Sequence, residues 1–407
     1  MKVLVSGASV AGPVLAYWLR RYGFEVTVVE RAPALRKAGG HAVDLFRPAM
    51  DIVERMGVLE PVLAAKTGTQ WLTLHTEGGG RPVELELRRV MAAVSDRHVE
   101  IMRDDLSEIL YEATRHDVDY VFGDSIASVS DDGEVAFDSG RTSAYDLVVG
   151  ADGLHSNVRR LVFGPESRFT TWIGAYLAVA TVPDFLGLDD RMEGMAGVGW
   201  MAALYSAVHM DDARAGFLFR TPEPLDYHHR DVARQKELLR ERFGGLGWQV
   251  PRILEEIDRA PAFYMDSITQ LRLDTWSRGR VTLVGDAGYC PGPAVGGSTS
   301  LAVVGAYVLA GELAAHGGDH TRAFPAYEAE LGEYVRRSRA FAVRAARGIV
   351  PGSRFDLWAL TRGARLVNRL PVALTRAAVK AGSKGVRLHD SIMLKDYAAR
   401  QGTTSRP

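Results

Sequence analysis

The chain has 407 residues, of which 47% are hydrophobic and 24% charged, which is typical of a globular enzyme with room for several subdomains. Its 49 Lys and Arg nearly balance its 50 Asp and Glu, so overall charge gives no attraction to nucleic acid. The single cysteine, Cys290, excludes an intrachain disulfide and a multi-cysteine metal site, and it favours a reducing compartment. Without a signal peptide or an apolar run of membrane-spanning length, we expect a cytoplasmic protein that uses no membrane.

A nucleotide-binding pattern occupies residues 2–30. An apolar run, a glycine-rich turn, a helical segment and a second strand ending at Glu30 form the pattern of a βαβ unit. Gly7 permits the tight turn and Gly12 lets helix and strand pack closely, while Ser9 stands where the fingerprint has its second glycine. Glu30 lies where a carboxylate accepts the hydroxyls of an adenosine ribose. The segment therefore predicts an ADP-containing cofactor.

Two further segments have the order strand, turn, helix. Residues 145–159 read YDLVVGADGLHSNVR, in which Asp152 follows a strand and precedes a helical start. Residues 280–313 read RVTLVGDAGYCPGPAVGGSTSLAVVGAYVLAGEL, in which Asp286 ends an apolar strand and a glycine-proline loop leads to a long helix of small residues. Alone, each segment is consistent with an ordinary connection between a strand and a helix.

Together the three segments resemble the class A FAD-dependent aromatic monooxygenases with the p-hydroxybenzoate hydroxylase fold, most closely the tetracycline-modifying and actinobacterial natural-product monooxygenases. The resemblance covers about 345 residues from the N-terminus. It implies an α/β fold in which a Rossmann-like FAD-binding domain is interleaved with a mixed β-sheet substrate domain, followed by C-terminal helices. It also implies non-covalent FAD and NADPH or NADH as co-substrate.

The resemblance assigns cofactor contacts. Asp286 would bind the ribityl chain of FAD, the loop through Pro293 would pass the pyrimidine edge, and the next helix would direct its positive end there. The expected cofactor-binding residues are Gly7, Ser9, Gly12, Glu30, Arg31, Arg47, Arg103, Asp152, Asp286, Pro293, Gly296, Gly297 and Ser298. The chain departs from the family pattern at Tyr289 (usually histidine), Ser298 (glycine) and Ser300 (asparagine). Residues 38–46 resemble a mobile loop along the flavin, and Cys290 is expected to be a packing residue.

Strand-like patterns in residues 171–274, joined by strands from 70–99, predict the substrate domain. The expected organisation is FAD-binding parts at 1–69, 100–170 and 275–345, substrate parts at 70–99 and 171–274, and helices at 346–407. Aromatic and sulfur side chains favour a flat, apolar substrate. The candidate contacts are Trp172, Tyr176, Trp200, Met201, Tyr205 and Phe217. Alternation along strands divides them between two faces, and which face covers the flavin stays open.

We therefore expect a monooxygenase, monomeric or homodimeric, that inserts one oxygen atom into an aromatic or polycyclic molecule through a flavin hydroperoxide. No residue is assigned as the catalytic acid or base. A flavin-dependent halogenase is disfavoured because its W-x-W-x-I-P stretch is absent, and a plain NAD-dependent dehydrogenase leaves Asp286 unexplained. A non-oxygenating protein that binds flavin or a drug-like ligand stays open. So does a membrane-docked quinone hydroxylase, because residues 331–407 hold sixteen Lys and Arg against four Asp and Glu.

Overall fold

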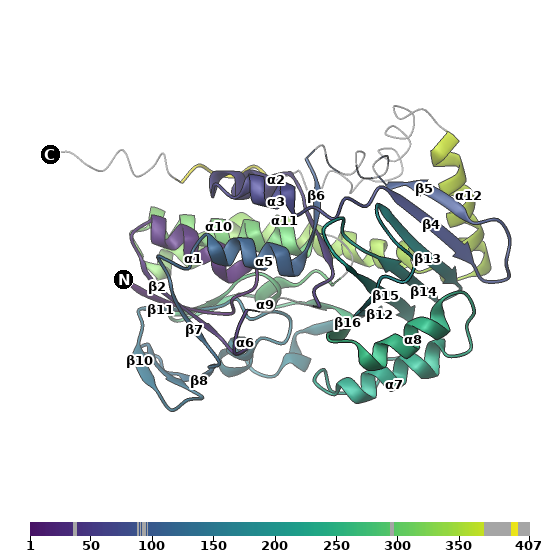
Figure 1. Cartoon of the computed structure of the whole chain (residues 1–407). Coiled ribbons are helices and arrows are strands. Elements are labelled where there is room, and N and C mark those ends of the chain that lie inside the picture. Colours follow the sequence, from purple (N-terminus) through teal and green to yellow (C-terminus); the bar gives the residue numbers. More distant parts are fainter. Residues whose placement is uncertain are drawn as a thin grey trace.

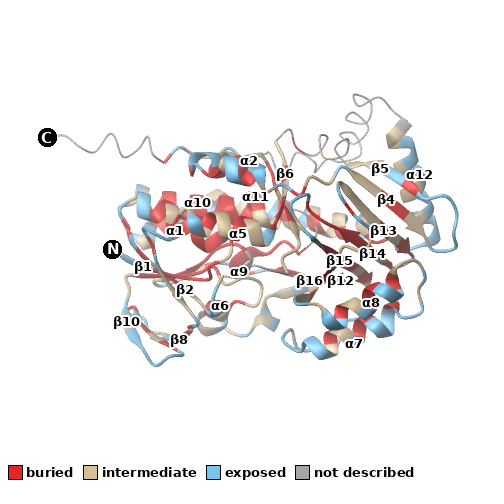
Figure 2. Cartoon of the chain, in the orientation of Figure 1, coloured by how far each residue is buried: buried red, intermediate tan, exposed pale blue. Residues whose placement is uncertain are grey.

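The computed structural model describes residues 1–35, 39–87, 89, 91, 95, 97–293, 297–369 and 392–397. Two large β-sheets lie next to each other, and each has its own covering helices (Figure 1). The most deeply buried ribbon follows the strands of the first sheet and the helix at residues 298–315 (Figure 2). The architecture is the predicted α/β fold with helices and mixed sheets.

The first sheet brings the three sequence motifs together. Its order is β17 (Ser277–Arg278), β18 (Val281–Leu283), β11 (Leu147–Gly150), β1 (Lys2–Ser6), β2 (Glu25–Glu30) and β7 (Asp119–Phe122). From β18 to β7 every pairing is parallel. Each of the motif strands β1, β11 and β18 therefore ends at the same sheet edge, which is where open α/β sheets bind their ligands.

Helices α1 (Ala11–Arg21), α5 (Arg103–Glu112) and α10 (Ser298–Ala315) lie over this sheet (Figure 1). By length and composition α10 could cross a membrane, contrary to the expectation that no segment would reach that length, but 78% of it is buried inside the protein. Helix α10 is therefore a core helix that packs with the first sheet.

Shorter elements lie near the first sheet. They are β3 (Ala42–Leu45), α2 (Arg47–Arg55), α3 (Leu59–Ala64), β6 (Val99–Met102), α6 (Asn157–Val162), η1 (Glu166–Arg168) and α9 (Asp286–Tyr289), with a small sheet of β8 (Ile126–Val129), β9 (Glu134–Phe137) and β10 (Thr142–Ala144).

The second sheet is built from two distant parts of the chain. Its order is β16 (Phe263–Leu271), β12 (Thr170–Pro183), β15 (Asp212–Arg220), β14 (Trp200–Tyr205), β13 (Arg191–Gly197), β4 (Trp71–Thr76) and β5 (Val83–Glu86). Strands β4 and β5, from the first of these parts, pair in one sheet with the strands of residues 170–271. Helices α7 (Val232–Phe243) and α8 (Val250–Arg259) pack on one face and bury a separate apolar core.

The C-terminal region packs against both sheets. Helix α11 (His320–Ile349) begins beside α10, and its last turns place Ala342 and Ala346 against Ala175 and Ile268 of the second sheet. Helix α12 (Arg354–Arg369) then lies along β5 (Figure 1). Residues 392–397 return to α10, where the Tyr397 hydroxyl donates to Glu312 at 2.8 Å.

Candidate active site

Glycines shape the turn after β1. Gly7 has a φ of 111°, and a Cβ there would lie 2.5 Å from the carbonyl oxygen of Ala151. A Cβ at Gly12 would lie 1.9 Å from the carbonyl oxygen of Gly7. Both positions therefore require glycine: Gly7 because the segment after β11 lies against it, and Gly12 because helix α1 packs directly on the turn. No described side chain caps the N-terminus of α1, and its first turn carries no acidic residue, so its N–H groups suit an anion.

A carboxylate and a guanidinium flank this helix start. The two oxygens of Glu30 accept the N–H groups of Ala8 at 3.0 Å and Ala32 at 2.9 Å, which fixes the carboxylate at the end of β2. Arg103, at the start of α5, donates to the Ser9 hydroxyl at 3.1 Å and is otherwise exposed. These contacts bring together Ser9, Glu30 and Arg103, and the expected contacts of these residues with the cofactor stay a prediction. Arg31 is exposed beside them, and Arg47 is half-buried at the start of α2.

Asp286 follows β18 at the same edge of the sheet. Burial raises the pKa of its carboxyl group, while the Cys290 thiol and the charge of Arg103 lower it. Arg103 and Asp286 are therefore close enough to interact electrostatically. Cys290 itself is fully buried, and burial together with the charge of Asp286 raises the pKa of its thiol well above the ordinary value, so it is an unreactive thiol at neutral pH.

Helix α10 points its N-terminus toward this region. Its cap, Gly297, has a φ of 89°, and no described side chain caps the helix. Pro293 ends the described part of the preceding loop, Ser298 is the first helical residue, and Gly296 lies outside the described residues. The departure at Ser300 has a role, because its hydroxyl accepts from the Phe46 N–H at 2.9 Å and donates to the Asp44 carbonyl at 3.0 Å.

The tyrosine that replaces the family's histidine turns into the core. Tyr289 is fully buried, and its hydroxyl accepts a hydrogen bond from Tyr327 of α11 at 3.0 Å. Gly305 of α10 gives it space, since a Cβ there would lie 1.9 Å from the Tyr289 hydroxyl oxygen. Tyr289 therefore packs the region behind Asp286.

Asp152 organises the helix that follows the second motif. Its carboxylate accepts the Ser156 hydroxyl at 2.5 Å and the N–H groups of Asn157 at 2.9 Å and Val158 at 3.1 Å. These bonds hold the start of α6. The expected contact between Asp152 and the cofactor stays a prediction, because these bonds are all within the chain.

The segment at residues 39–46 joins the two sheets, while Ala38 lies outside the described residues. The Gly40 N–H donates to Asp104 at 2.6 Å, and the Gly40 carbonyl accepts from the Arg214 guanidinium at 3.1 Å. The Ala42 N–H donates to the Tyr205 hydroxyl at 3.3 Å. Its expected mobility stays a prediction, and these contacts show which bonds a movement would break.

The second sheet presents two different faces. Trp172, Tyr176, Trp200 and Phe217 belong to or pack against the core under α7 and α8, together with Met265. Since side chains alternate along a strand, the neighbouring residues point the other way, to a face that we call the inner face. Among the described residues, the inner face includes Met192, Met201, Tyr205, Arg214, Tyr264 and Asp266.

The inner face contacts residues 40–42, the segment expected to lie along the flavin. Besides the bonds of Tyr205 and Arg214 to residues 40–42, the Tyr264 ring stacks on His41 with centroids 6.2 Å apart. Thus two of the six candidate substrate residues, Met201 and Tyr205, lie on the inner face, and the other four pack beneath helices. Sequence reasoning included His41 in the expected flavin loop without assigning it a role, and it missed Arg214 and Tyr264. Side-chain alternation shows which residues share a face with Tyr205. It could have identified the inner face only if the contact between Tyr205 and Ala42 had already been known.

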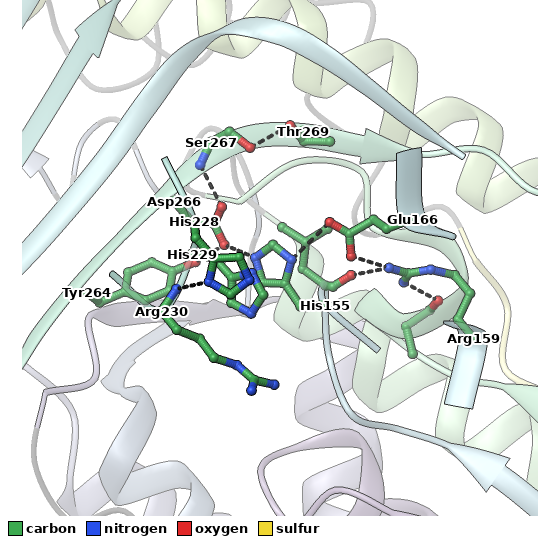
Figure 3. Close-up of polar contacts among 12 residues, drawn as sticks. His155, Arg159, Glu166, His228, His229, Arg230, Tyr264, Asp266, Ser267 and Thr269 are labelled. Carbon is green, nitrogen blue, oxygen red and sulfur yellow. Dashed lines mark hydrogen bonds and ion pairs between the residues drawn. The ribbon is translucent and has the colours of Figure 1, made fainter. Parts of the chain in front are cut away.

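A charged network joins residues that follow β11 of the first sheet to β16 of the second sheet (Figure 3). His155 lies between Glu166 and Asp266, with ring nitrogens 2.9 Å and 2.8 Å from their carboxylate oxygens. Burial alone would lower the pKa of His155, but the hydrogen bonds to Asp266 and Glu166 raise it to about 9. Glu166 also accepts from the fully buried Arg159 at 2.6 Å.

The residues at the sheet edge fit FAD. A carboxylate at the end of β2 suits the ribose, the α1 start with Arg103 suits the pyrophosphate, and Asp286 with the α10 start suits the ribityl chain and the flavin's pyrimidine edge. These donors and acceptors come from three distant motifs and meet at one edge of one sheet.

Comparison with known proteins agrees with this reading. The model of the FAD binding domain family matches residues 1–347, and the chain belongs to that family. It is an FAD-dependent monooxygenase: a flavin-dependent monooxygenase of Legionella longbeachae is 39% identical over 346 residues, covering 84% of this chain and 88% of that protein.

Other relatives extend the comparison. An uncharacterized protein of Mycobacterium tuberculosis is 45% identical over 341 residues, covering 83% of this chain and 91% of that protein. The crystal structure of tetracycline destructase Tet(51) aligns with a TM-score of 0.82 at 34% identity, covering 97% of this chain and 99% of that chain. At 20% identity and a TM-score of 0.73, a single-substitution variant of Klebsiella pneumoniae HpxO complexed with FAD shares the fold; the alignment covers 95% of this chain and 99% of that chain.

Proposed function

We propose that this monooxygenase uses NADPH or NADH and O₂ to insert one oxygen atom into a flat aromatic or polycyclic molecule of the tetracycline or polyketide kind. The observation that carries the proposal is the inner face of the second sheet. There Tyr205 belongs to a cluster against which Ala42 and Met192 pack, its hydroxyl accepts from the Ala42 N–H, and strand alternation puts Met201 on the same face. Sulfur and aromatic side chains offer a flat apolar ligand a large contact area. The similarity to tetracycline destructases supports a polycyclic substrate.

When bound, FAD supplies the redox chemistry, since it takes a hydride from the nicotinamide and reacts with O₂. The chain's own residues position the reactants. Glu30 and Arg103 hold the adenosine and pyrophosphate part, and Asp286 with the α10 N-terminus holds the flavin part. Positive potential at that N-terminus stabilises negative charge on the pyrimidine edge. Residues 39–46 and the inner face keep water away from the substrate.

His41 and Tyr205 are uncharged groups where residues 39–46 meet the inner face. Burial and the nearby charge of Arg103 lower the pKa of His41 to about 4, so its imidazole is neutral at physiological pH. Burial raises the pKa of the Tyr205 hydroxyl to about 12, so it stays protonated. The proposed role of these groups is orientation of an uncharged substrate.

The test uses the purified holoenzyme. FAD released by acid should be intact, and anaerobic reduction by NADPH or NADH should be slow alone and faster with a polycyclic phenol or tetracycline. After readmission of ¹⁸O₂ the product should gain one labelled oxygen atom. A ligand that binds but leaves reduction unchanged, with only hydrogen peroxide formed, would show a flavin-holding binding protein. Label derived from water would refute oxygen transfer from O₂.

A further inference from the structure

The network around His155 extends to the inner face through Asp266. Both ring nitrogens of His155 face carboxylate oxygens, so both must donate and the ring must be an imidazolium. The His229 ring stacks on it at 3.9 Å between centroids with the planes 9° apart. Burial and the neighbouring charge of His155 lower the pKa of His229 to about 4, so it stacks as a neutral ring.

One arm of the network is anchored in the flavin unit. Glu166 pairs with Arg159, and Arg159 donates to the backbone carbonyl of Ala287 at 2.9 Å and to that of Leu154 at 2.5 Å. Ala287 follows Asp286 in the chain. The imidazolium of His155 is therefore held in a fixed place relative to the cofactor residues.

The other arm ends at Tyr264. Asp266 is 4% exposed, and its Oδ1 accepts the Ser267 N–H at 2.7 Å. Its Oδ2 accepts from His155 at 2.8 Å and from the Tyr264 hydroxyl at 3.3 Å. Figure 3 shows Tyr264 and His155 meeting at this carboxylate. Burial, followed by the charge of Asp266, raises the pKa of Tyr264 well above its ordinary value, so the hydroxyl keeps its proton.

The direction of that proton decides what Tyr264 can recognise. Because the hydroxyl donates to Asp266, its oxygen keeps lone pairs for an incoming donor. Its ring is half-buried and stacks on His41, and the charges of Arg103 and Asp286 act on it, so Tyr264 is an inner-face residue close to the expected cofactor contacts.

We propose that Tyr264 is a substrate-contacting residue whose hydroxyl oxygen accepts a hydrogen bond from a phenol or enol O–H of the substrate, and that His155, acting through Asp266, is the positioning residue that sets this polarity. The inference rests on the proposed aromatic substrate class. It makes the enzyme select hydroxylated rings over the same rings with the hydroxyl blocked, because a lost donor leaves Tyr264 unpaired.

Equilibrium binding to the oxidised holoenzyme tests this without turnover. The probes are 2-naphthol and 2-methoxynaphthalene, and the signal is the visible absorbance of bound FAD. Wild type should bind 2-naphthol roughly tenfold more tightly than the ether, the value of one hydrogen bond. Tyr264→Phe should bring this ratio near one and leave the affinity for the ether unchanged.

The positioning role has its own variants. His155→Gln and Asp266→Asn should each lower the ratio by roughly threefold or more, again with an unchanged ether affinity. The control is Tyr176→Phe on the opposite face of the sheet, where the ratio should stay at the wild-type value. FAD content and melting temperature confirm that each variant is folded.

Each outcome has a separate meaning. If the wild-type ratio is near one, or if Tyr264→Phe keeps the wild-type ratio, the role of Tyr264 is refuted and the proposed function stands. If His155→Gln weakens both probes equally, His155 is a general structural residue and its positioning role is refuted. If neither probe perturbs the wild-type flavin spectrum, the aromatic substrate class itself is refuted.

Discussion

Arg159 donates from α6 to the backbone carbonyl of Ala287 at 2.9 Å, which joins the second sequence motif to the third. The same fully buried guanidinium pairs with Glu166 at 2.6 Å. Arg159→Met keeps much of the volume, but the Glu166 Oε2 atom and the carbonyl groups of Ala287 and Leu154 lose the Arg159 donor. We expect the free energy of unfolding in urea to fall by about 3 kcal/mol. Arg160→Met, on the exposed side of the same helix, should change it by less than about 0.5 kcal/mol. Equal effects of the two substitutions would contradict this account.

The charge on His155 makes part of the stability depend on pH. Its pKa is raised from the ordinary 6.5 to about 9 in the folded protein, so its contribution is complete below pH 6.5 and is lost as pH rises through about 9. The difference in unfolding free energy between wild type and His155→Gln should therefore shrink between pH 7 and pH 10. A difference that stays constant or grows over this range would show that His155 is neutral in the folded protein.

Glu30 and Asp286 should contribute separately to FAD retention. Glu30→Gln and Asp286→Asn each replace a charged acceptor with a neutral amide, and each should weaken FAD binding roughly tenfold, as measured by the recovery of free FAD fluorescence on dilution. Glu25→Gln is the matched control, because Glu25 starts the same strand and, among the described residues, forms an ion pair with Lys2 at the surface. FAD affinity that survives both cofactor substitutions would place the flavin elsewhere.

Gly305 should respond to alanine in the opposite sense from an exposed helical glycine. A Cβ at Gly305 would overlap the Tyr289 hydroxyl, whereas one at Gly363 of α12 meets no atom within 4 Å. Gly305→Ala should therefore lower the melting temperature, although alanine is the better helix former by about 1 kcal/mol. Gly363→Ala should raise it. Adding Tyr289→Phe to Gly305→Ala should recover part of the loss, and no recovery would mean that another contact is responsible.

The cofactor half of the site was predictable from the sequence because its signals are local. Gly7 and Gly12 lie five residues apart in one turn, Glu30 ends the strand that follows, and Asp286 directly follows its own strand. Each pattern reports a backbone requirement that neighbouring residues impose. The sheet then brings the three patterns together, since parallel strands end at a common edge.

The substrate half was less predictable because alternation defines two faces without saying which one is covered. Trp172 and Phe217 fit a flat ligand as well as they fit the core, and only the packing of α7 and α8 assigns them to the core. The His155 network gave no local signal either. Asp266 lies 111 residues from His155 in the chain. Its carboxylate can accept from His155 only when β16 lies beside the start of α6.

The order of strands in the first sheet also governs how the chain can fold during synthesis. Strand β1 pairs on one side with β2, which follows immediately, but its other partner is β11 at Leu147–Gly150, and β18 next to it begins only at Val281. At the usual translation speed roughly 15 to 55 seconds pass between the synthesis of β1 and that of β18. During that time Leu4 and Val5 belong to an incomplete sheet with an open edge, and the Asp286 half of the flavin site does not exist. The free edge of β1 can be paired once β11 has been made, whereas the edge of β11 and the Asp286 part of the cofactor site are completed only by β18 and the residues after it.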